Sequence, residues 1–406
     1  MKVQSMRIYM EDGCKAGVLT IENSKITAFT PGTDPEAIDY GDKRIIPGIF
    51  DTHNHASCGF SPRESEGSPE ERVYQTKGYL KALASQGTVN VLPTLSAVTP
   101  LEGFAAVTSV IEEGPQDGAK ILGIHSEGPW LNRVGEKGIK TGWPEVSLDY
   151  AKAMVETCHG HLRLVALAPE IPGIDPIIEY FLSQGVAIAA AHSDNNFQQA
   201  MAAYDKGISV ATHLGNVMTG LHHRDVGGLG AAILHPNVEC EVICDGLHIC
   251  NEMLKLYFRM KDTDRFMMIS DCSNLSGGPA GRYRVTSKKK YFTAEGEMNL
   301  TPEGFLLSDT GRLRGSSQPV LYDIGNLVEK VGVPMETVLK MACLNPCKKY
   351  GFADQKGSLA VGKDADFAVI TDDYKAQCTY SEGRKVYDRD VDGIVLNEKY
   401  FEENRL

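Results

Sequence analysis

The hydrophobic pattern divides this chain into a strand-rich start, a long alternating middle and a strand-rich end. Near the N-terminus, apolar residues 18–21 and 25–29 flank the turn-forming segment Glu22-Asn23-Ser24, which predicts a β-hairpin. From residue 45 onward, short apolar runs alternate with amphipathic stretches of helical period. That alternation is typical of βα units that build a parallel sheet.

Eight apolar runs in the middle region predict strands: Ile45–Phe50, Val89–Leu95, Ile121–His125, Leu164–Ala168, Val186–Ala191, Ser209–Thr212, Glu241–Cys244 and Phe266–Ser270. Helical periodicity lies between most of them: Glu70–Ser85, Leu101–Glu112, Leu148–His159, Pro176–Ser183, Phe197–Asp205 and Asn251–Lys261. Such a succession favours a (β/α)8 barrel of the TIM type, in fold class α/β. The alternative is a doubly wound open sheet, which predicts no metal ligands around one ring of strand ends.

The remaining segments predict a second, smaller unit. Residues 272–316 are rich in Gly, Ser and Lys and predict an irregular insertion, followed by helices at Val320–Val331 and Met335–Ala342. Short strand patterns return at 366–370 and 383–387. Because the two ends share a character that the middle lacks, we expect residues 1–44 and 355–406 to form one β-sandwich domain, with the barrel, residues 45–354, inserted into it.

The composition limits the partners that this protein is expected to bind and the cellular compartment in which it is expected to work. A net charge of −12 argues against nucleic acid or an anionic membrane surface, so an anionic substrate would need a local cationic group. No apolar run has the length of a membrane span, and we expect no signal peptide. The 10 cysteines are scattered without a CxxC pair, which predicts reduced thiols and a cytoplasmic protein.

The first candidate site is the segment Asp51-Thr52-His53-Asn54-His55, which directly follows an apolar run. Side chains alternate along a strand, so His53 and His55 are expected on the same face. Two imidazoles on one face can hold a divalent metal. Taken alone, a pair of surface histidines in a loop is an equally good interpretation.

Polar residues that can bind metal also end several other predicted strands: His125, Glu127, His192, His213 and Asp271. All strand C-termini of a barrel open onto one face, where chemistry is found. Glu127, His192 and His213 make a three-ligand set of the kind that catalytic zinc sites use. His53 and His55 would build a second site beside it, with Glu127 as a bridge.

Each of these residues also has a structural interpretation. Glu127 could cap a turn, His192 could be a core histidine with its hydrogen bonds satisfied, and Asp271 could cap a helix. All of these holding at once, on one rim of a barrel, is improbable.

A family resemblance rests on a set of motifs: His125-Ser126-Glu127-Gly128-Pro129-Trp130, Ala191-His192-Ser193, Thr212-His213-Leu214-Gly215-Asn216-Val217-Met218, His222-His223-Arg224-Asp225, Asp245-Gly246-Leu247-His248, Ser270-Asp271 and Gly315-Ser316-Ser317. Together with the HxH pair, their order resembles the amidohydrolase superfamily. The turn Gly357–Asp366 resembles the start of that superfamily's C-terminal β-sandwich segment. Within it, nearly the whole chain resembles the N-acetylglucosamine-6-phosphate deacetylases.

The resemblance implies removal of the acetyl group from N-acetylglucosamine 6-phosphate, giving glucosamine 6-phosphate and acetate. It implies that Glu127, His192 and His213 bind metal and that Asp271 transfers the proton. It implies that the remaining matched residues contact substrate, the arginine at its phosphate: Asn216, Val217, Arg224 and His248. It further implies a homodimer in which Arg224 reaches the neighbouring active site. For His222 and His223, a solvated loop pair remains an equally good interpretation.

Some positions depart from the family pattern. Because His53 and His55 are kept, one or two ions per subunit are expected, zinc in the first place and iron or another divalent ion otherwise. After Lys137-Gly138, where many relatives carry histidine, the chain has Ile139-Lys140, so Lys140 is the candidate for that substrate contact. The departures leave N-acetylgalactosamine 6-phosphate open as the substrate. A hydrolase of unphosphorylated amides and a non-enzymatic assembly protein are two competing interpretations of the whole chain.

Overall fold

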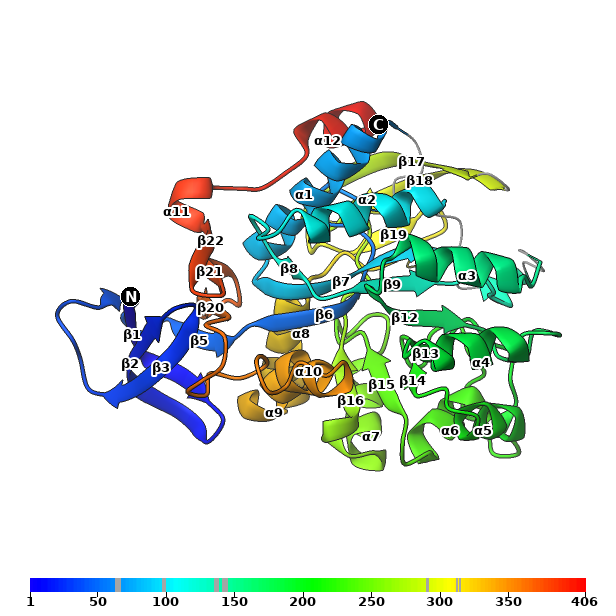
Figure 1. Cartoon of the computed structure of the whole chain (residues 1–406), viewed down its shortest axis with the longest axis horizontal. Coiled ribbons are helices and arrows are strands. Elements are labelled where there is room, and N and C mark those ends of the chain that lie inside the picture. Colours follow the sequence, from blue (N-terminus) through cyan, green and yellow to red (C-terminus); the bar gives the residue numbers. More distant parts are fainter. Residues whose placement is uncertain are drawn as a thin grey trace.

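A parallel barrel forms the centre of the chain, and a sheet built from both termini lies beside it (Figure 1). The computed structural model describes residues 1–62, 67–96, 100–134, 139–140, 145–289, 292–311, 313 and 315–406. The predicted fold class, a (β/α)8 barrel with a small β unit from both termini, is confirmed. The boundaries 1–44, 45–354 and 355–406 stay a prediction.

The barrel strands are all parallel and follow the order β16-β15-β14-β13-β12-β9-β7-β6. Their bounds are β6 Ile49–Asn54, β7 Thr88–Ser96, β9 Ile124–Glu127, β12 Leu162–Leu167, β13 Ala187–Ala190, β14 Val210–Ala211, β15 Glu239–Val242 and β16 Phe266–Met268, with β8 Lys120–Ile121 beside β7. The last strand returns to the first, because the Asp271 amide donates to the His53 carbonyl at 2.8 Å. Apolar side chains such as Phe50, Leu164 and Met267 fill the interior.

Helices cover the barrel: α1 Pro69–Ser85, α2 Leu101–Glu112, α3 Leu148–Thr157, α4 Asp175–Ser183, α5 Phe197–Asp205, α6 Gly227–Leu234, α7 Asn251–Met260, α8 Val320–Asn326, α9 Met335–Leu339 and α10 Asn345–Lys349. Short segments η1 Thr263–Arg265, η2 Leu327–Val331 and η3 Lys340–Leu344 connect or extend them. The sequence specifies several helix starts locally. In α5 the Asn196 side chain accepts from the Gln199 amide, and the Gln199 side chain returns to the Asn196 amide, which is a complete capping box.

The terminal sheet contains β1 Lys2–Met10, β2 Gly13–Glu22, β3 Lys25–Pro31, β4 Ile38–Asp39, β5 Arg44–Pro47, β20 Phe367–Ile370, β21 Ala376–Ser381 and β22 Arg384–Asp388. Strand β5 pairs with β20, so the two ends of the chain meet in one sheet. The predicted hairpin is β2–β3, and its turn residues Asn23 and Ser24 both have positive φ, as a two-residue hairpin turn requires. The chain ends with α11 Arg389–Asp392 and α12 Glu398–Asn404.

Three predictions about elements were wrong. The apolar run 45–50 is two strands, because Pro47 ends β5 in the terminal sheet and Gly48 leads into β6 of the barrel. The run 121–125 is likewise divided between β8 and β9. Residues 272–316 contain a three-stranded antiparallel sheet, β17 Gly281–Lys289, β18 Phe292–Leu300 and β19 Leu306–Ser308, where an irregular insertion was expected. Its buried Tyr283 packs edge-on against Phe401 of α12, a contact far away in sequence.

No helix in the described part of the chain is long and apolar enough to cross a membrane. The cysteines are all free: Cys14, Cys58, Cys158, Cys240, Cys244, Cys250, Cys272, Cys343, Cys347 and Cys378. Most of them are buried, and burial raises the pKa of thiols such as Cys158, to about 12, and Cys58, to about 11. These side chains therefore act as small apolar packing residues.

Candidate metal centre

The predicted ligands lie together at the carboxyl ends of the barrel strands. His53 is the penultimate residue of β6 and His55 directly follows that strand, Glu127 is the last residue of β9, and the others lie two or three residues past β13, β14 and β16. His192, His213 and Asp271 have φ values of 50°, 30° and 49°. These left-handed conformations are costly for non-glycine residues, and such strain concentrates at functional sites.

The first cluster joins Glu127, His192 and His213. His192 Nε2 lies 3.0 Å from Glu127 Oε1, and His213 Nε2 lies 3.3 Å from the same oxygen. The two imidazole Nε2 atoms are 3.1 Å apart. Three ligand atoms from three strand ends therefore face one point.

The second cluster joins His53, His55 and Asp271. The Nε2 atoms of His53 and His55 are 3.4 Å apart and lie 3.5 Å and 3.2 Å from Asp271 Oδ1. Glu127 connects the clusters, because its Oε2 is 3.2 Å from His55 Nε2 while its Oε1 faces the first cluster. The expectation that this carboxylate lies between two histidine sets agrees with the geometry.

These spacings fit divalent ions. Ligand atoms at about 2.0–2.1 Å from a tetrahedral ion lie roughly 3.3 Å from one another. The distances within the first cluster are 3.0, 3.1 and 3.3 Å, and those within the second are 3.2, 3.4 and 3.5 Å. Two imidazole nitrogens at such a distance can share only one hydrogen, so an ion satisfies their lone pairs better than they satisfy each other.

The electrostatics of the centre favour a cation. Burial lowers the pKa of His53, but Asp271, Glu241 and Glu127 outweigh burial and raise this pKa to about 10. Burial likewise opposes ionisation of Asp271, yet His53 and His55 hold its pKa below the usual range. When these histidines are neutral, as metal ligands are, the ionised Glu127 and Asp271 need a positive charge, which a divalent ion supplies.

Residues behind the ligands orient them. His55 Nδ1 lies 2.9 Å from the Thr94 carbonyl oxygen, and His213 Nδ1 lies 3.2 Å from that of Asn216. These contacts leave both Nε2 atoms free for an ion.

His53 differs, because its Nδ1 faces a carboxylate, Glu241 Oε2, at 3.5 Å. Glu241 is fully buried in β15, and its Oε1 accepts from the Thr52 hydroxyl at 2.8 Å. Sequence reasoning missed Glu241. The available signal was an acidic residue at the start of an otherwise apolar predicted strand.

His248 is held beside the centre by Asp245. His248 Nδ1 lies 2.6 Å from Asp245 Oδ2, and the amides of Leu247 and His248 both donate to Asp245 Oδ1. Burial lowers the pKa of His248, while Asp245 outweighs burial and raises it. With Nδ1–H donated to Asp245, the neutral imidazole of His248 presents Nε2 as an acceptor, and the protonated imidazole presents Nε2–H as a donor.

The other predicted substrate residues lie at the rim. Asn216 and Val217 follow His213, and the Val217 carbonyl accepts from the Ser193 amide at 3.2 Å, next to His192. Arg224 is exposed on the loop between β14 and α6, and within the described part of the chain nothing links it to the metal ligands by a hydrogen bond or ion pair. Lys140 lies in the short β10–β11 pair, Arg133–Val134 with Ile139–Lys140, and its side chain is outside the described residues.

A closed parallel barrel with two carboxylate–histidine clusters at its catalytic edge defines a metal-dependent hydrolase of the amidohydrolase type. The sequence profile of the amidohydrolase family matches residues 44–386. The chain belongs to this family.

The proteins that resemble this chain over most of its length include deacetylases of amino sugar phosphates. N-acetylglucosamine-6-phosphate deacetylase of Vibrio furnissii is 30% identical over 369 residues, covering 90% of this chain and 88% of the relative. N-acetylgalactosamine-6-phosphate deacetylase of Escherichia coli O157:H7 is 29% identical, covering 90% and 93%. Among solved structures, the N-acetylglucosamine-6-phosphate deacetylase of Thermotoga maritima superposes with a TM-score of 0.76 at 25% identity, over 96% of this chain and 100% of that one.

Proposed function

We propose that this protein removes the acetyl group from N-acetylglucosamine 6-phosphate, releasing glucosamine 6-phosphate and acetate. The observation that carries the proposal is the pair of histidine–carboxylate clusters joined by Glu127. The similarity to curated deacetylases over nine-tenths of the chain supports the substrate. A relative that acts on the galacto epimer is 29% identical, so the sugar needs a direct assay.

Each residue has a defined task in the reaction. In the proposal, Glu127, His192 and His213 hold one divalent ion, and His53 and His55 hold a second. The chemistry that such an ion supplies is a water molecule that ionises near neutral pH. Zinc suits this nitrogen and oxygen donor set, and iron suits it as well.

Asp271 is the proposed base and acid. Because its pKa is low beside His53 and His55, the carboxylate is ionised before substrate binds. It takes a proton as water attacks the acetyl carbonyl, and it delivers that proton to the sugar nitrogen as the carbon–nitrogen bond breaks. His248, oriented by Asp245, contacts the substrate through Nε2, which donates a hydrogen bond when the imidazole is protonated.

Recognition of the 6-phosphate falls to Arg224, with Asn216, the Val217 backbone and Lys140 as further contacts. A guanidinium grips phosphate through two parallel hydrogen bonds. Asp225 anchors the loop, because its Oδ1 accepts from the Gly227 amide at 2.8 Å and the Phe197 amide at 3.2 Å. Arg224 is exposed, as is Leu221 in the same loop, which supports a role across a homodimer interface, at the neighbouring active site.

Reduced cysteines support a cytoplasmic location in this proposal.

Acetate release from a panel of N-acetyl amino sugars tests the function. The panel holds N-acetylglucosamine and N-acetylgalactosamine, each with and without a 6-phosphate. We expect the highest kcat/KM for N-acetylglucosamine 6-phosphate and a large loss without the phosphate. A kcat/KM ratio near one between phosphorylated and free sugars would refute phosphate recognition, and a preference for the galacto epimer would reassign the substrate.

A further inference from the structure

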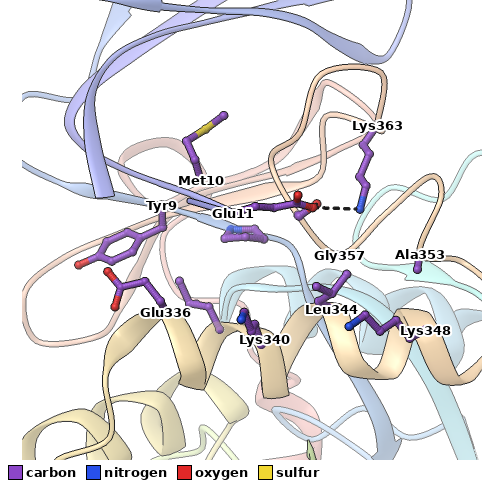
Figure 2. A pocket seen from close by; sticks show the side chains of 13 residues that line it. Tyr9, Met10, Glu11, Glu336, Lys340, Leu344, Lys348, Ala353, Gly357 and Lys363 are labelled. Carbon is purple, nitrogen blue, oxygen red and sulfur yellow. Dashed lines mark hydrogen bonds and ion pairs between the residues drawn. The ribbon is translucent and has the colours of Figure 1, made fainter. Parts of the chain in front are cut away.

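A hollow lies near the amino-terminal end of β6, away from the metal centre. It has a volume of about 460 Å³ and lies where the β1–β2 turn of the terminal sheet meets the helices α9 and α10 (Figure 2). Its lining includes Pro47, which precedes β6. Because the metal ligands sit at the other end of β6, roughly 20 Å of strand separates Pro47 from His53.

The helical wall supplies two cations. Lys340 of η3 and Lys348 of α10 line the hollow along its helical side (Figure 2). Both are exposed, and neither forms an ion pair with any carboxylate among the described residues. The charged lining consists of Lys340, Lys348 and Lys363 against Glu11 and Glu336, which gives this concave space a net positive charge in a chain whose net charge is −12.

The opposite wall is already neutralised. Glu11 accepts from the Ser358 hydroxyl at 2.5 Å and lies 3.5 Å from Lys363 Nζ. The Ser358 hydrogen bond holds the pKa of Glu11 below its usual range, so this carboxylate is ionised and paired. The ammonium groups of Lys340 and Lys348 are therefore the charges available to a ligand, with Glu336 near Tyr9 as an acceptor for hydroxyl groups.

The remaining lining is apolar and held in place. Leu339, Leu344 and Ala353 line the hollow between the charged groups. The loop wall packs tightly on the helices at Gly357, where an added Cβ would meet the Cys343 carbonyl, Cys347 Cβ and Leu344 Cα at 3.0 Å. Its φ of 86° also requires glycine. The hollow is thus part of a well-packed junction.

We infer that this hollow is an accessory binding site for a small organic phosphate of about the size of a hexose phosphate. The phosphate lies between Lys340 and Lys348, the carbon skeleton against Leu339 and Leu344, and hydroxyl groups toward Glu336. The volume falls within the range of about 300–1,000 Å³ that is usual for small-molecule sites. The inference does not depend on the chemistry at the metal centre.

Bound ligand would connect three segments that are far apart in sequence: the β1–β2 turn, the α9–α10 helices and the loop 353–363. The junction reaches the barrel, because the Cys343 thiol lies 3.5 Å from the carbonyl oxygen of Pro47. Gly48 then connects Pro47 to β6. Binding should therefore stabilise the contact between the terminal sheet and the barrel by mass action.

Lysine acetylation followed by peptide mass spectrometry tests the site on the full-length protein. The probe is glucose 6-phosphate, which has no acetamide to hydrolyse, and the internal control is Lys255, an exposed lysine of α7. We expect Lys340 and Lys348 to react roughly threefold more slowly once two thirds of the sites are occupied, with Lys255 unchanged. Unchanged rates at all three lysines, at glucose 6-phosphate concentrations that saturate the active site, would overturn the inference.

Two further experiments test which ligand binds in the hollow and which residues bind it. Inorganic phosphate should protect less than glucose 6-phosphate, because it lacks contacts with Leu339 and Glu336; equal protection would reduce the hollow to an ion site and refute the organic ligand. The double variant Lys340→Gln/Lys348→Gln should weaken binding at this site by roughly tenfold in calorimetry and keep wild-type kcat/KM. Retention of both binding events at wild-type affinity would exclude the two lysines.

Discussion

At the scale of single residues, the two clusters differ in what surrounds them. His192 and His213 share Glu127 Oε1 at 3.0 and 3.3 Å, which makes a compact three-ligand set. We expect His192→Ala to lose both bound metal and activity, and His53→Ala to lose at most a second ion. Elemental analysis of the purified variants measures this, with His159→Ala as an exposed control. Equal metal loss in the His192 and His53 variants would contradict the ranking.

Asp271 offers a separate test, because it faces the clusters without belonging to the first one. Asp271→Asn keeps the shape of the side chain and removes its ability to take a proton. We expect retained metal at Glu127, His192 and His213, a similar KM, and a loss of kcat of about 10²-fold or more. An unchanged kcat in a metal-loaded variant would rule out proton transfer by Asp271.

Glu241 acts on the metal only through His53. Its buried carboxylate faces His53 Nδ1, which favours Nδ1–H and leaves Nε2 as the ligand atom. We expect Glu241→Gln to weaken binding of a second ion by about 10–100-fold while the first ion stays bound. Metal titration followed by elemental analysis measures both occupancies. Wild-type occupancy of the second position would show that Glu241 does not support it.

At the scale of elements, Lys356 joins the terminal sheet to the barrel. It is buried, lies 2.8 Å from Asp364 and 2.7 Å from Asp366, and Asp366 also accepts from Asn90 of β7 at 3.2 Å. Lys356→Met leaves the buried Asp366 without its cation and Asp364 with Lys25 alone, which should cost about 3–5 kcal/mol of stability at pH 7. Differential scanning fluorimetry gives the fall in Tm. Lys375→Met, which breaks an exposed pair, should change Tm little.

The same contact predicts a pH dependence of stability. Burial raises the pKa of Asp364, but Lys25 and Lys356 outweigh burial, so its pKa in the folded state lies below the ordinary 3.8. A lowered carboxyl pKa adds stability above 3.8, and this stability is lost as pH falls through the folded value. The Tm deficit of Lys356→Met should therefore shrink below about pH 4. A deficit that is constant from pH 7 to pH 3 would argue against an electrostatic origin.

At the scale of the whole molecule, the proposed homodimer places Arg224 at the neighbouring active site. Mixing Arg224→Ala subunits with Asp271→Asn subunits tests this, since each variant alone is expected to be weak. If Arg224 acts across the interface, each mixed dimer has one site with both functional residues, and activity returns. Each variant mixed with itself is the control. Verified subunit exchange without recovery would eliminate the shared site.

The sequence by itself determined the class of fold and the candidate ligands of a metal centre. Strand and helix periodicity are local properties, and the ligands follow strand ends that a barrel must bring to one edge. His53, His55, Glu127, His192, His213 and Asp271 could therefore be named without coordinates. The turn at Asn23 and Ser24 was equally local, because its backbone conformation depends on those residues.

Only the tertiary structure decided the features that depend on pairing between distant segments. The division at Pro47 and Gly48 became visible because β5 pairs with β20, more than 300 residues along the chain. The core of the three-stranded insertion includes Phe401, which lies outside its own segment. The contact of Glu241 with His53 and the hollow beside Lys340 likewise depend on segments that are far apart in the sequence. A side chain's partner is set by which strands and helices become neighbours, and no periodicity along the chain records that.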